Sequence, residues 1–162
     1  MHRVAAGTLD EAGWTLAKST EGEFTVKLPL QFNDFTTIEN NPAEPVKRTF
    51  VVGGERADGA RFLAMRVEYR AGAQAAKLHF VGAKTMMERN GNLNESKELK
   101  FNKMPAWDAT SCQLTTGCGS VRYVLAGDTI FMLVAEYPVA KREDFRAQLD
   151  TFFKSLKYQP LH

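Results

Sequence analysis

The chain has 162 residues, of which 44% are apolar and 25% are charged, a composition typical of a folded globular protein. A chain of this length corresponds to one ordinary domain and can bury a core without the help of metals. The 21 basic residues nearly balance the 19 acidic ones and leave a formal net charge of +2. Nucleic-acid binding needs concentrated positive charge, so this balance argues against a nucleic-acid partner. No apolar run reaches the length of about 18 residues that a transmembrane helix needs.

The first 13 residues are small and polar and show no periodicity. They predict a flexible N-terminal arm over residues 1–13, followed by one folded domain over residues 14–158. The arm lacks the apolar stretch of about 7–15 residues that a signal peptide contains. Two interpretations therefore stay open: the protein is cytoplasmic, or an export signal preceded this sequence and has been removed.

Two short strands are predicted near the N-terminus. The first begins at Trp14. In the second, over residues 23–28, Phe24, Val26 and Leu28 alternate with polar residues, as in a strand with one buried face. Pro29 ends this strand, because a proline cannot donate a hydrogen bond to a neighbouring strand.

Residues 30–46 are predicted to form a long irregular segment, since they contain two asparagine-rich pairs and two prolines. Long loops in compact domains are often functional. Four apolar residues lie within this segment, namely Leu30, Phe32, Phe35 and Ile38. Either they pin the loop onto the core, or Phe32, Phe35 and Ile38 form part of an apolar binding surface.

Residues 47–52 and 61–70 predict two further strands joined by a glycine-rich turn. In the second, four apolar residues alternate with charged ones. The apolar side chains would point in one direction, and a set of charged residues would make the other face wet: Arg61, Arg66, Glu68 and Arg70.

A helix is predicted over residues 73–89, because the apolar period changes there to that of a helix. At 100° per residue, four side chains fall within about 60° of one another: Ala76, Phe80, Ala83 and Met87. The pair Asn90-Gly91 favours the end of a helix.

Four strands are predicted in the second half, over residues 97–102, 106–114, 120–125 and 129–137. The last one is apolar on both faces, which is typical of the centre of a sheet that helices cover. A C-terminal helix follows, with an apolar stripe at helical spacing that is expected to pack on the sheet: Phe145, Leu149, Phe152 and Leu156.

Cys112 and Cys118 lie near the facing ends of two predicted strands, and a short turn separates them. Cysteines in this arrangement can reach the spacing that a disulfide needs. Zinc sites need four ligands, and the C-x-x-C spacing of a redox pair is absent. The two residues are therefore either a structural disulfide or two buried thiols. A disulfide would favour the periplasm or another exported location, since disulfides persist outside the cytosol.

No catalytic or cofactor motif is present in the sequence. Glycine-rich phosphate loops are absent, and only His79 could serve as a base within the predicted domain. We therefore predict no cofactor, no metal and no enzymatic activity. Trp107 stands at the start of a strand, where it either packs in the core or stacks against a ligand.

Three segments together resemble the PsbP/Mog1/DcrB-like superfamily. Residues 22–29 resemble its opening FxVxFP strand, residues 122–131 resemble its late hairpin, and residues 152–157 resemble the F-x-x-S-F end of its closing helix. Residues 104–107 occupy the place of a G-x-P turn, although Lys103 or Met104 stands where the family has glycine. The resemblance spans about residues 14–158.

The resemblance implies an α+β fold, in which a mainly antiparallel β-sheet is covered by helices as an α/β/α sandwich of the PsbP/Mog1-like type. Superfamily members are accessory or binding proteins, among them photosystem-associated proteins, a Ran-binding factor, periplasmic lipoproteins and secretion-effector chaperones. They share no catalytic residue that this sequence could match.

Three functional hypotheses follow. The leading one is a non-enzymatic, exported binding domain whose partner is an unknown protein or a small apolar ligand. The second is a cytoplasmic chaperone or adaptor that binds an apolar partner segment, which predicts an exposed hydrophobic patch. The third is a hydrolase with an unrecognised carboxylate site, which requires converging carboxylates with perturbed pKa values. The sequence leaves the oligomeric state open.

Overall fold

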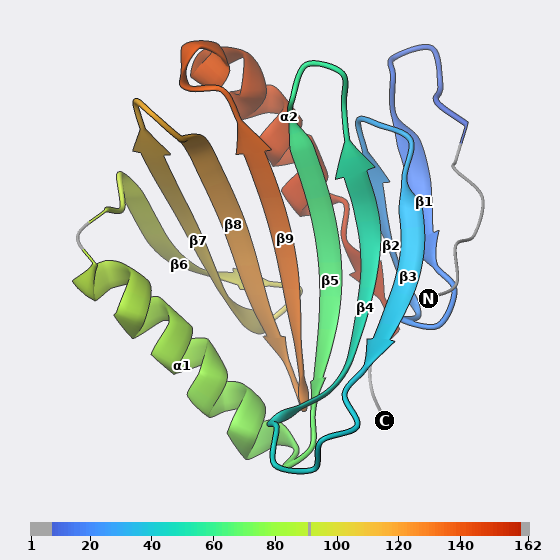
Figure 1. Ribbon diagram of the computed structural model, residues 1–162, viewed down its shortest axis with the longest axis vertical. Helices are drawn as coiled ribbons and strands as arrows, with labels where there is room; N and C mark the ends of the chain where they lie inside the picture. The colour runs from blue at the N-terminus through green and yellow to red at the C-terminus, as the bar shows by residue number, and fades with distance from the viewer. Residues whose placement is uncertain (1–7, 91, 160–162) are drawn as a thin grey trace.

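A seven-stranded antiparallel sheet forms the centre of the molecule in the computed structural model, which describes residues 8–90 and 92–159 (Figure 1). Its strand order is β3-β4-β5-β9-β8-β7-β6. The strands of this sheet are β3 (Asn33–Ile38), β4 (Val46–Glu55), β5 (Arg61–Tyr69), β6 (Glu95–Phe101), β7 (Met104–Gln113), β8 (Gly117–Ala126) and β9 (Thr129–Tyr137). A small sheet consists of β1 (Thr15–Ser19), β2 (Phe24–Leu28) and β10 (Lys157–Tyr158), in the order β1-β2-β10.

The two faces of the large sheet are covered by different elements. Helix α2 (Arg142–Lys154), which follows the short 3₁₀ helix η1 (Val139–Lys141), lies behind the sheet together with the small sheet. Helix α1 (Ala73–Arg89) packs on the opposite face, which we call the front face (Figure 1). The arrangement is the predicted α+β sandwich, with the addition of a second sheet that the sequence pattern did not indicate.

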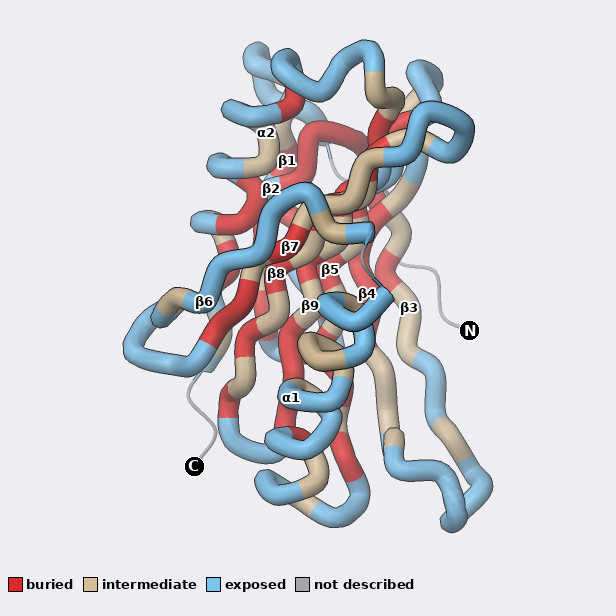
Figure 2. Tube along the Cα trace, turned by 90° about the vertical axis from the view of Figure 1, so that its left-hand side faces the viewer, coloured by how far each residue is buried: buried red, intermediate tan, exposed pale blue. Residues whose placement is uncertain are grey.

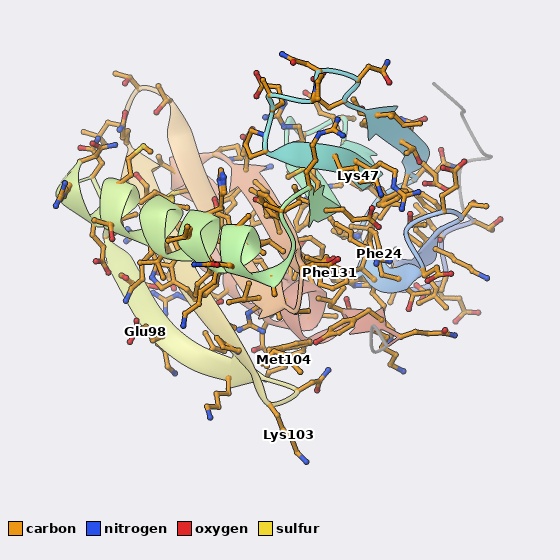
Figure 3. The ribbon with its side chains drawn as sticks, turned by 90° about the horizontal axis from the view of Figure 1, so that it is seen from below. Phe24, Lys47, Glu98, Lys103, Met104 and Phe131 are labelled. Atoms are coloured by element: carbon orange, nitrogen blue, oxygen red, sulfur yellow. A yellow bond between two sulfur atoms is a disulfide. The ribbon has the colours of Figure 1, made fainter. Side chains whose placement is uncertain are left out.

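Aromatic rings hold α2 to the back of the large sheet. Phe62 of β5 stacks on Phe145, with ring centroids 6.1 Å apart, and meets Phe152 edge-on at 5.3 Å. Phe24 of the small sheet packs edge-on against Phe131 of β9 at 5.7 Å (Figure 3). Such pairs add packing energy to the burial of apolar area, so this side carries the main core of the molecule.

A buried arginine joins the small sheet to the large one. Arg66 of β5 is 7% exposed, and its guanidinium donates a 2.7 Å hydrogen bond to the Gly22 carbonyl in the β1–β2 turn. The turn comes so close to the large sheet that a Cβ atom at Gly22 would lie 2.8 Å from the Cβ atom of Phe50 in β4. The prediction of a wet face is therefore wrong at Arg66, because the β1–β2 turn covers it. It is also wrong at Glu68, whose side chain is 13% exposed and pairs with Arg48 and Arg66.

The remaining strands and both helices lie where the sequence pattern predicts them, apart from shifts at their ends. The all-apolar strand β9 is the fourth of seven and therefore central, as expected. The prediction of an irregular segment over residues 30–46 is wrong for its first half, because residues 33–38 form strand β3 and pair with β4. The two prolines lie after β3, in the turn that leads to β4, so they do not interrupt its hydrogen bonds.

Replacing Phe152 with alanine is expected to lower the free energy of unfolding by roughly 3–5 kcal/mol, because the ring is fully buried and its loss leaves a cavity. Urea unfolding followed by circular dichroism measures this change. The matched control is Leu16→Ala at a residue that is 64% exposed, which should change stability by less than about 0.5 kcal/mol. Similar losses from both variants would contradict the packing described here.

Candidate functional site

The four residues predicted as a binding surface do not lie together. Phe32 is 8% exposed and belongs to the main core. Trp107 is 1% exposed; its indole N–H donates to the Ser96 hydroxyl at 2.8 Å, and its ring stacks on Tyr123. Phe35 is half-buried and pairs with a residue of β4, whereas Ile38 is 62% exposed at the end of β3. The structure therefore does not bring these four side chains into one site.

The β7–β8 hairpin carries the cysteine pair. Cys112 and Cys118 face each other in the strand register, with Cα atoms 4.0 Å apart, and form a disulfide. Cys118 is buried in the main core, and Cys112 packs against that core. The bond therefore closes the turn of residues 113–117 and fixes it to the end of the large sheet.

Leu114 stands at the tip of this turn and is 95% exposed. The turn lies close to the end of β9, since a Cβ atom at Gly117 would lie 2.9 Å from the Tyr137 carbonyl oxygen. Gly117 also has a φ of +93°. Both the backbone conformation and the close approach require glycine. The local sequence thus places an exposed leucine on a turn that a disulfide closes and a glycine shapes.

A hollow of about 640 Å³ lies beside Leu114. Its other walls come from the β7–β8 turn and from the segment after β9, and they include Thr116, Gly117, Tyr137, Pro138 and Val139. Glu136 also lines it, but its carboxylate forms a 2.7 Å ion pair with Arg61. The hollow is therefore lined by both polar and apolar groups, and the charge of its carboxylate is balanced by Arg61. We call Leu114 and this hollow the hairpin-tip site.

A second hollow, of about 400 Å³, adjoins the first on the front face of the sheet. The two share Thr116, Gly117 and Glu136. Apolar side chains of three elements line the second hollow, namely Met87 of α1, Val121 of β8 and Val134 of β9. The hairpin-tip site thus continues toward the end of α1.

Two further hollows lie away from the disulfide. One, of about 470 Å³, opens beside the small sheet and is lined by Lys18, Glu23, Lys157 and Tyr158 among others. The other, of about 460 Å³, contains Asp58. The hydrogen bond from the Arg56 guanidinium lowers the pKa of Asp58 to about 2, which is the opposite of the raised pKa that an acid catalyst needs.

Residues 8–90 and 92–159 contain neither a cluster of metal-ligating side chains nor a membrane-spanning helix. No three His, Cys, Asp or Glu side chains in these ranges are grouped so that they could hold a metal ion. None of the helices in these ranges is long and apolar enough to cross a membrane.

A solved structure shares the architecture described above. Cyanobacterial PsbP (CyanoP) from Synechocystis sp. PCC 6803 superimposes with a TM-score of 0.56, covering 96% of this chain and 98% of that one. The chain has a PsbP-like fold. The two sequences are 8% identical, so the likeness concerns the fold alone. No family model matches the chain, and no curated protein matches it in sequence.

The sequence pattern indicated the cysteine pair that closes the β7–β8 turn, but it did not indicate the hairpin-tip site. Leu114 is a single leucine in a polar turn, and the pattern of apolar residues gives no reason to single it out. The available signal was its position between two cysteines, because a residue inside a disulfide-closed turn cannot fold back into the core. Pro138 and Val139 lie more than twenty residues further along the chain, and only the register of β8 and β9 brings them close.

Removing the disulfide with the double variant Cys112→Ser, Cys118→Ser is expected to lower the free energy of unfolding by about 2 kcal/mol, since the closed loop is short. Urea unfolding measures the difference. Wild-type protein prepared without reductant should show no free thiol when titrated in denaturant. Two titratable thiols in that protein, or unchanged stability of the double variant, would contradict the bonded hairpin.

The pH dependence of Asp58 provides a separate test. Its folded-state pKa of about 2 lies below the ordinary value of 3.8, so its contribution is complete above pH 3.8 and disappears as the pH falls through 2. Because the side chain is 29% exposed, Asp58→Asn should lower stability at pH 7 by less than about 1 kcal/mol. The unfolding curves of variant and wild type should differ at pH 7 but not at pH 2. An equal loss of stability at both pH values would refute the Arg56–Asp58 ion pair.

Proposed function

We propose that the protein is a non-enzymatic binding domain that holds an apolar segment of a partner protein at the hairpin-tip site. The observation that carries this proposal is Leu114, which is 95% exposed on a disulfide-closed turn beside a hollow of about 640 Å³. A large apolar side chain that is both exposed and rigidly held loses little freedom when a partner covers it. Covering an exposed leucine removes its apolar surface from water, which contributes roughly 1.5–3 kcal/mol.

The chemistry of the hollow indicates the kind of partner. Its apolar walls and the Glu136–Arg61 ion pair leave no unbalanced charge within it. A charged side chain bound there would lose water without gaining a partner. The site therefore fits an uncharged segment with branched aliphatic side chains, and the adjoining hollow at Met87 could accept a second one.

An exported location is the second part of the proposal. The support for it is the Cys112–Cys118 disulfide, because such bonds persist in oxidising compartments and are rare in the cytosol. The resemblance to a superfamily with periplasmic members agrees with this location. A cytoplasmic chaperone would bind the same kind of apolar segment but would lack the disulfide in the cell.

The hydrolase alternative finds less support. Its carboxylates would have to converge in a cleft and carry raised pKa values. Glu136 is paired with Arg61, and the Arg56 guanidinium holds the pKa of Asp58 low. Asp58 is therefore not set up to donate a proton near neutral pH.

The binding proposal can be tested by titrating ¹⁵N-labelled protein with a blocked pentapeptide of alanine, valine and leucine. Amide shifts should change at residues 113–119, 136, 137, 139 and 140. A blocked peptide of lysine and glutamate, equal in length, should leave them unchanged. Replacing the exposed leucine, as Leu114→Ser, should lower the affinity for the apolar peptide about tenfold, because the apolar surface of the leucine is then no longer buried.

The matched control is Leu16→Ser, since Leu16 is also exposed but lies on the small sheet. This variant should bind the apolar peptide like wild type. Shifts spread over the whole surface, or equal weakening by the two variants, would show that binding is non-specific and would overturn the proposal.

A further inference from the structure

Helix α1 is only weakly buried by its own chain. It is 17 residues long, yet Ala76 is its one fully buried residue. Its inner side packs on a small cluster from β5 and β9, which includes Val67, Tyr69 and Ile130. Three large apolar residues of the same helix remain exposed, Leu78 at 67%, Val81 at 51% and Met86 at 63%. In Figure 2 the helix lies in front of the sheet, and no other described element passes over its outer side.

The outer side of α1 carries an uncharged stripe. At 100° per residue, Leu78, Val81, Gly82 and Thr85 fall within about 100° of one another, on the side opposite Ala76. Arg89, the last residue of the helix, falls in the same sector, so the stripe is uncharged over residues 78–85. Charged residues lie on one flank of this stripe, where Lys84 forms an ion pair with Glu98 of β6. We call these four residues the outer stripe. An uncharged stripe of this kind is typical of a helix that packs against another surface.

Gly82 lies in the middle of the outer stripe. Glycine is destabilising inside a helix compared with alanine. A Cβ atom at this position would meet no atom within 4 Å, so nothing in the chain itself requires the glycine. A glycine in the middle of an apolar stripe does, however, let the backbone of a second helix come close.

We infer that the outer stripe pairs with the same stripe of a second copy, with the two α1 helices antiparallel and a two-fold axis close to Gly82. This inference is independent of the hairpin-tip site. Leu78 and Thr85 stand at nearly equal distances on either side of Gly82. A two-fold axis there brings Leu78 of each copy against the region of Thr85 of the other, so the stripe complements itself.

The charges on the flank favour the antiparallel arrangement. Lys77 and Glu88 also lie on one flank at nearly equal distances from Gly82, and in an antiparallel pair each faces the opposite charge of the other copy. Lys77 forms no ion pair within the described residues. Glu88 lies 3.9 Å from Lys84, which also pairs with Glu98, and the Glu88 side chain is 47% exposed and so can also face a charge of the other copy. A parallel pair would place this flank against His79 and Met86 instead, where it finds no complementary charge.

The expected dimer is weak. One helix stripe provides less than the roughly 800 Å² per partner of a standard stable interface. Sedimentation velocity of the wild-type protein should therefore show a monomer at low concentration and a dimer at high concentration. Val81→Glu should abolish the dimer, whereas Leu114→Ser should leave it unchanged. A monomer at every concentration, or loss of the dimer in Leu114→Ser alone, would overturn the inference.

Cysteine cross-linking tests the axis directly. Two antiparallel helices in close contact would place the Cα atoms of Gly82→Cys within the range of about 4.4–6.8 Å that a disulfide needs. The matched control is Gln74→Cys, an exposed position at the start of the same helix. The two Gln74 positions would lie roughly 24 Å apart along the helix axes, at 1.5 Å per residue.

Under mild oxidation, Gly82→Cys should form a covalent dimer at least about tenfold faster than Gln74→Cys, because the dimer raises the local concentration of the thiols. Equal rates would indicate random collision or a parallel pair and would contradict the inference. Charge reversal gives an independent check. Lys77→Glu should weaken the dimer about two- to tenfold, as expected for exposed ion pairs, and adding Glu88→Lys should restore it.

Discussion

Phe62 lies between the large sheet and α2, with the rings of Phe145 and Phe152 packed against it. Around these rings, two elements cover the back face of the sheet. They are helix α2 and the small sheet, which Arg66 holds in place. Within residues 8–90 and 92–159, the front face is covered by α1 alone, and the cluster beneath that helix is small. This unequal covering is the constraint on which the rest of the structure depends, because the back supplies stability and leaves the front and the hairpin tip free for binding.

Sequence patterns predicted the features that depend on residues close together in the chain. The stripes of both helices, the central position of β9 and the cysteine pairing all follow from spacing within one or two segments. The misplaced features depend on contacts between distant segments. The predicted wet face of β5 failed at Arg66, whose charge is covered by a turn more than forty residues earlier in the chain. Residues 33–38 look irregular because prolines follow them, yet pairing with β4 makes them a strand.

The candidate sites show the same difference between features that local sequence predicts and features that distant contacts decide. The sequence singled out aromatic residues as binding candidates, but Phe32 and Trp107 are buried because large rings contribute most to a core. The large apolar residues that are exposed in the described part of the chain include no aromatic residue. For three of them, local geometry keeps the side chain from turning inward. Leu114 is held out by the disulfide turn, and Leu78 and Val81 are held out by the helix, whose other side already faces the sheet. A PsbP-like fold provides the frame for these positions without specifying their partners.

Native-state hydrogen exchange tests the unequal covering of the two faces most directly. At a concentration where the protein is monomeric, amides of β5, β9 and α2 should exchange only through global unfolding, because the aromatic core must be lost to expose them. Amides of α1 should exchange through a smaller opening, with a clearly lower free energy, since few buried contacts hold the helix. Protection of α1 equal to that of β5 and β9 would contradict the account, because the front face would then be as firmly closed as the back.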